Sequence, residues 1–86
     1  MEELLLDIIA AIRKRGDAVP GDELADMILA HIKRTGAVRS ECSKRRLLPF
    51  YLRLKREDPK RWGRLGIAPE EEPLLIRTLR VKPRRT

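Results

Sequence analysis

Cys42 and His31 are the residues of this chain that could act as a nucleophile and a base. Such a pair also needs a third group that orients the base, and the two residues fall on different expected helices with no third group implied. Three cations follow Cys42 closely and could lower the pKa of its thiol, which would make the thiol easier to oxidise. A small packing residue at the start of a helix is the simpler interpretation. We therefore expect no active site within this chain.

The chain lacks the residue spacing that a metal or cofactor site requires. His31 has no second His or Cys nearby at ligand spacing, and its apolar neighbours favour a packing role over that of a ligand or a base. The single cysteine excludes an intrachain disulfide and a Cys-only zinc site. The adjacent acids Glu70, Glu71 and Glu72 lack the alternating spacing of a calcium loop. We expect no metal and no cofactor in this chain.

Basic and aromatic residues gather in one stretch, residues 39–64. It holds ten Lys or Arg against three acids, together with all three aromatics of the chain. Residues 39–66 carry a net charge of +7, whereas residues 1–38 carry −2 and residues 67–86 carry +2. A concentrated positive field with planar side chains inside it is typical of a surface that binds nucleic acid.

Lys and Arg contact phosphates, and aromatic rings stack on unpaired bases. The expected nucleic-acid contacts are Lys44, Arg45, Arg46, Arg53, Lys55, Arg56, Lys60, Arg61, Trp62 and Arg64. The alternative is a solvated helical face with the aromatics in the core, and we expect Phe50 at least to be buried. If about six phosphates were neutralised, log affinity would fall with log salt at a slope of about −5.

Helices must position these side chains. Residues 2–15 carry an apolar stripe at i, i+3, i+4 and i+7, with acids in the first turns and cations in the last, as the helix dipole favours. A second helix is expected from Asp22, its N-cap, to Arg34. Ser40 can cap a third helix over residues 41–48, which Pro49 breaks or kinks.

Shorter helices are expected after Pro49. One covers residues 50–57, and Asp58-Pro59 provides an N-cap and first residue for a turn that Gly66 ends. Residues 74–81 fit both a helix and an alternating strand, and we favour the helix.

These elements predict an all-α fold, a small helical domain with a helix-turn-helix-like layout. A winged helix with a short C-terminal β element is the alternative, although Gly63 and Gly66 interrupt the first strand that it needs. We expect residues 1–72 to form a helical nucleic-acid-binding domain and residues 73–86 to lead toward an absent catalytic domain. Cysteine usage fits a cytoplasmic protein, and no apolar run approaches the roughly 20 residues that span a membrane.

The C-terminal residues carry a family resemblance. Lys82-Pro83-Arg84-Arg85-Thr86 resembles the Lys-Pro-x-Arg-Thr segment that leads into the radical-SAM barrel of the elongator catalytic subunit family, so Lys82, Pro83, Arg85 and Thr86 match position by position. The leucine-rich residues 74–79 and the Ile-rich residues 5–12 are similar to that family in outline. The chain stops before the family's cluster cysteines and acetyltransferase domain.

The resemblance implies the N-terminal part of a tRNA wobble-uridine carboxymethylating acyltransferase, whose iron–sulfur cluster, S-adenosylmethionine and acetyl-CoA belong to the parent and not to this chain. The expected function is therefore tRNA binding through phosphates, with the parent's catalytic domain as a second partner. One alternative is a helix-turn-helix DNA-binding transcriptional regulator that reads duplex DNA with residues 40–48. Another is a protein-interaction module for an acidic partner.

Overall fold

The computed structural model describes residues 2–37 and 44–80, and it is all-α. Five helices follow one another: α1 (Glu2–Arg15), α2 (Gly21–Thr35), α3 (Lys44–Glu57), α4 (Pro59–Gly63) and α5 (Glu72–Leu79). The all-α class is confirmed, and residues 2–37 and 44–80 contain no strand that could form a wing. The expected cap at Ser40, the thiol of Cys42 and the family motif at residues 82–86 lie outside the described residues.

The first two helices follow the apolar pattern of the sequence. α1 buries Leu4, Leu5, Ile8, Ile9 and Ile12 along one face. It ends at Gly16, whose φ of 75° is left-handed, a conformation that glycine adopts at little cost. The N-cap of α2 lies two residues earlier than expected: Pro20 occupies that position, so Asp22 lies in the first turn and does not cap the helix.

α3 corrects the expectation that Pro49 separates two helices. One continuous helix runs from Lys44 to Glu57 with Pro49 inside it. A proline cannot donate to the carbonyl four residues earlier, here that of Arg45. Both Arg45 and Pro49 are exposed, so water can reach that carbonyl. The lost bond is therefore tolerated on the outer face while the inner face packs.

The connection from α3 to α4 matches the sequence pattern closely. The Asp58 carboxylate accepts a hydrogen bond from the backbone N–H of Arg61 at 3.3 Å, and Pro59 occupies the first turn. α4 ends at Gly63, before the expected end at Gly66, whose φ is 65°. Pro73 lies in the first turn of α5, and residues 72–79 are a helix and not a strand.

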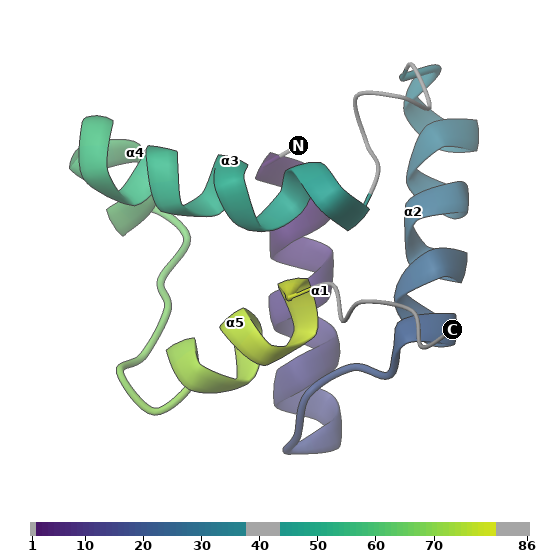
Figure 1. Cartoon of the computed structure of the whole chain (residues 1–86), viewed down its shortest axis with the longest axis horizontal. Helices are drawn as coiled ribbons and strands as arrows, with labels where there is room; N and C mark the ends of the chain where they lie inside the picture. Colours follow the sequence, from purple (N-terminus) through teal and green to yellow (C-terminus); the bar gives the residue numbers. More distant parts are fainter. Residues whose placement is uncertain (1, 38–43, 81–86) are drawn as a thin grey trace, which may run out of the picture.

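The helices share one core, which positions α3 across the others (Figure 1). α1 and α2 lie side by side and antiparallel, α3 crosses the N-terminal end of α1, and α5 packs on both α1 and α3. The expected domain boundary between residues 72 and 73 falls inside α5. Leu75 and Leu79 of that helix are buried in the core of α1 and α3, so residues 72–79 belong to the same globular unit.

Candidate nucleic-acid interface

Four arginines occupy the side of α3 that faces away from the core. Leu47, Tyr51 and Leu54 form the buried face. At 3.6 residues per turn, residues seven or eleven positions apart lie nearly above one another, and this spacing joins the exposed arginines into one surface. The α3 arginine surface consists of Arg45, Arg46, Arg53 and Arg56.

Most of the α3 arginine surface is free of internal partners. Among the described residues, Arg45, Arg46 and Arg53 make no ion pair. Arg56 pairs at 3.1 Å with the adjacent Glu57, but the two side chains are 76% and 58% exposed. An exposed pair of this kind contributes roughly 0–1 kcal/mol, so a phosphate can replace Glu57 at little cost.

The cations of α4 divide into free and paired groups. Lys60 and Arg64 are exposed and, in the described part of the chain, unpaired. Arg61 forms an ion pair with Glu2 at the start of α1 and lies 3.8 Å from Asp58. Arg61 therefore connects α4 to α1, a role that its position in the basic stretch did not indicate. For Lys44 the structure gives only the position, in the first turn of α3.

Lys55 belongs to a polar network between α3, α4 and α5. Its ammonium lies 2.6 Å from the Glu72 carboxylate and 5.2 Å from the centre of the Trp62 ring. The Tyr51 hydroxyl donates to the same carboxylate at 2.6 Å and accepts a hydrogen bond from Trp62 Nε1 at 3.2 Å. Lys55 and Trp62 are thus engaged with their own protein, and they would have to exchange these partners to meet a nucleic acid.

The same network accounts for two shifted pKa values. Burial, reinforced by the hydrogen bond to Glu72, raises the pKa of the Tyr51 phenol to about 12. The hydrogen bonds from Lys55 and then Tyr51 lower the pKa of Glu72. Both shifts favour the state in which a neutral phenol donates to an ionised carboxylate.

The aromatic residues are placed differently from the expectation. Tyr51 is fully buried, whereas Phe50 is only partly buried and packs at the edge of the core. The difference follows from the continuity of α3: Tyr51 is four residues from Leu47 and three from Leu54, which places it on the buried face. Phe50 lies one position to the side, between Arg46 and Arg53, and is the aromatic residue closest to the α3 arginine surface in the helix.

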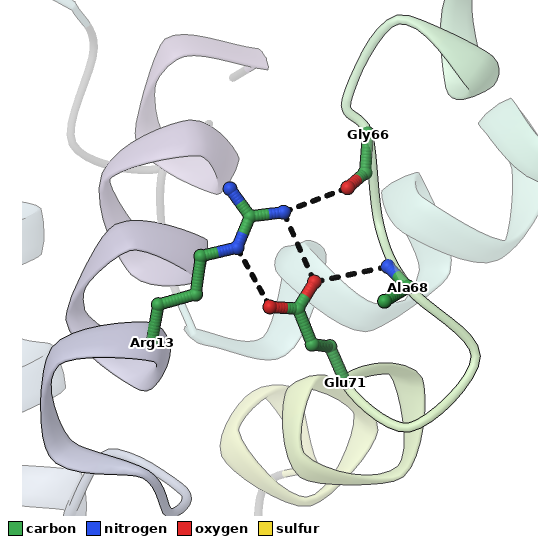
Figure 2. A network of polar contacts seen from close by, with 4 residues as sticks. All are labelled: Arg13, Gly66, Ala68 and Glu71. Atoms are coloured by element: carbon green, nitrogen blue, oxygen red, sulfur yellow. Dashed lines mark hydrogen bonds and ion pairs between the residues drawn. The ribbon is translucent and has the colours of Figure 1, made fainter.

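A second ion pair holds the loop before α5 against α1 (Figure 2). The Arg13 guanidinium donates two hydrogen bonds to Glu71, at 2.6 and 3.0 Å, and one to the Gly66 carbonyl at 2.7 Å. The Glu71 carboxylate also accepts from the backbone N–H of Ala68 at 2.9 Å. These donors, Arg13 first, lower the pKa of Glu71 to about 2. Glu71, one of the three adjacent acids, thus makes a structural contact between this loop and α1.

His31 confirms the expected packing role and adds an unexplained feature. The side chain is 4% exposed in α2, and its Nδ1 has no hydrogen-bond partner among the described residues. It lines a cavity of about 560 Å³ together with Glu2, Glu3, Phe50 and Arg61. The lone His among apolar neighbours indicated burial, but the sequence held no signal for the cavity, which forms where α1, α2, α3 and α4 meet.

No protein-family model, curated protein or solved structure matches this chain. The class of protein is therefore defined by the fold and its surface: a small all-α domain with a cationic outer face on its third helix. Within residues 2–37 and 44–80, no three metal-binding side chains come together. None of the helices that the structure describes has the length and apolar character required to cross a bilayer.

Proposed function

We propose that this domain binds RNA, with tRNA as the particular ligand, by contacts between the α3 arginine surface and phosphates. The observation that carries the proposal is the set of exposed arginines without strong internal partners on the outer side of α3. Solubility alone does not require them on one side of one helix.

The start of α3 supports the same proposal on energetic grounds. Its first turn contains Lys44, Arg45 and Arg46 and no acid. Cations at a helix N-terminus oppose the helix dipole, each at a cost of about 0.3–1 kcal/mol at low salt. A bound phosphate reverses this cost, because backbone N–H groups at the helix start and nearby arginines both attract an anion. An anionic ligand therefore explains why three cations occupy the first turn of α3, where they disfavour the free helix.

The resemblance of Lys82, Pro83, Arg85 and Thr86 to the elongator catalytic subunit family supports tRNA over other RNAs. On this proposal the chain is the tRNA-holding part of a wobble-uridine acyltransferase. Its cluster, S-adenosylmethionine and acetyl-CoA would be held by other parts of the parent, which is also its second partner.

The test is a competition measured by fluorescence anisotropy at fixed salt. A labelled tRNA bound to the 86-residue chain is displaced by unlabelled tRNA or by duplex DNA of equal phosphate content. We expect tRNA to compete more strongly than the duplex. Stronger competition by one duplex sequence would favour the DNA-binding regulator, and no binding to either nucleic acid would refute the proposal.

A further inference from the structure

Two neighbouring depressions share Phe50 and Arg61 as lining residues. The first, of about 560 Å³, lies among the start of α1, the end of α2 and the α3–α4 pair, and the second, of about 310 Å³, continues along α3 past Arg53 and Leu54. Phe50 and Arg61 line both. We call the combined depression the Phe50 groove. The volume of the first cavity alone is within the range of about 300–1,000 Å³ usual for small-molecule sites.

The groove has an aromatic wall beside a fixed guanidinium. Phe50 is partly buried, so the core holds its ring in place while part of it lines the groove. Arg61 is half exposed and is held by Glu2 and Asp58. A guanidinium fixed in this way has already lost much of its side-chain entropy, and such planar groups stack on bases.

The far wall of the groove offers an accessible hydrogen-bond acceptor, the Glu3 carboxylate, beside the buried side chain of His31. His31 is buried, yet its Nδ1 is unpartnered within the described part of the chain. Buried polar atoms are nearly always hydrogen-bonded, and an exception calls for an explanation such as strain, a catalytic role, a water or an ion. Glu3 lines the same cavity and, among the described residues, makes no ion pair. The Glu3 carboxylate can accept a hydrogen bond from an amino group in the cavity, whereas the His31 Nδ1 is shielded from the open space of the cavity.

The acids of the groove exclude a phosphate as its occupant. Glu2, Glu3, Glu57 and Asp58 line it, and like charges placed together are unfavourable. Phosphates can instead be bound at the edge of the groove by Arg46 and Arg53, because these two arginines lie one turn to either side of Phe50 on α3. At 1.5 Å per residue the two are about 10 Å apart along the helix, a span that brackets one nucleotide.

We infer that the Phe50 groove receives a single unpaired nucleobase of the bound RNA, one that carries an exocyclic amino group. The base stacks on Phe50 beside Arg61, its amino edge faces Glu3, and Arg46 and Arg53 hold the flanking phosphates. This inference rests on the proposed RNA binding and adds to it the part of the RNA that is recognised.

The test uses an RNA hairpin whose loop contains one 2-aminopurine, a base that loses fluorescence when it stacks on an aromatic ring. Binding to the unmodified chain and to Phe50→Tyr should quench the probe, whereas Phe50→Leu should bind without quenching. Loss of one stacked base should weaken hairpin binding by Phe50→Leu roughly 5- to 150-fold. The slope of log affinity against log salt concentration should not change, because Phe50→Leu removes no charge. Leu29→Ala, a truncation of an exposed leucine on α2, is the control and should behave as the unmodified chain.

A second variant tests the base preference without touching the core. Glu3 is exposed in the first turn of α1, so Glu3→Gln should lower the melting temperature by only a few degrees, through the lost interaction with the helix dipole. It should reduce the preference for hairpins with adenine loops over those with uracil loops, because the amide oxygen of Gln is a weaker acceptor than a carboxylate. Equal affinity of Phe50→Leu and the unmodified chain, or an unquenched probe in a saturated complex, would overturn the inference while leaving RNA binding intact. If no hairpin binds at any salt, the proposed function itself fails.

Discussion

Reversing two charges of the α3 arginine surface should change both the strength and the salt dependence of RNA binding. Arg45→Glu with Arg53→Glu alters one arginine near the start of α3 and one two turns later. Both are exposed and make no ion pair among the described residues. The double variant should therefore fold as the unmodified chain does, and any loss of binding reports on contact with the ligand.

The size of the effect follows from the number of free cations. Arg45, Arg46, Arg53, Lys60 and Arg64 are the exposed cations of the expected interface without an ion pair in the described part of the chain. Five phosphate contacts predict a slope of log affinity against log salt of about −4.5. Removing two contacts should bring the slope to about −2.7 and weaken binding at 0.1 M salt roughly 60-fold.

The control is Lys14→Glu with Lys33→Glu, which makes the same change in net charge on α1 and α2. Both lysines are exposed and lie outside the basic stretch. Anisotropy titrations of labelled tRNA at four salt concentrations would give affinity and slope for each protein. The reasoning is refuted if the two double variants lose affinity equally, or if the Arg45/Arg53 variant keeps the slope of the unmodified chain.

Three further predictions concern stability. Arg45→Glu alone should raise the melting temperature by roughly 2–6 °C at low salt, because an anion replaces a cation at the start of α3; a lower melting temperature by circular dichroism would contradict this. Glu71 has a pKa lowered from 4.5 to about 2, so its stabilisation is present above pH 4.5 and is lost as the pH falls from 4.5 toward 2. Urea titrations across that window should show that the free energy of unfolding depends less on pH in Glu71→Gln than in the unmodified chain. The same pH dependence in both proteins would refute the role of the carboxylate. Tyr51→Phe should lower the free energy of unfolding by about 1–3 kcal/mol, because Glu72 and Trp62 Nε1 lose their shared hydrogen-bond partner. In the unmodified chain, ultraviolet titration should find the Tyr51 phenol still protonated at pH 11.

Local signals were strong enough to determine the helices near their ends. Asp58-Pro59 predicted the start of α4 because a carboxylate cap and a proline act within one turn. The apolar stripe and terminal charges of residues 2–15 predicted the bounds of α1 for an equally local reason. Where a signal depended on its surroundings the prediction failed: Pro49 lies inside α3 because its missing bond falls on the solvent side, and the sequence does not say which side that is.

What the sequence by itself determined about this protein is therefore its class and its charge: an all-α chain whose positive charge is concentrated in residues 39–66. Only the tertiary structure decided which cations remain free. Lys55 and Arg61 meet Glu72 and Glu2, residues distant in the chain, because packing of α5 and α1 against the α3–α4 pair brings these partners within a few ångströms. The same packing buries Tyr51 and leaves Phe50 at the edge. Charge is a property of composition, whereas pairing and burial depend on which helices come into contact.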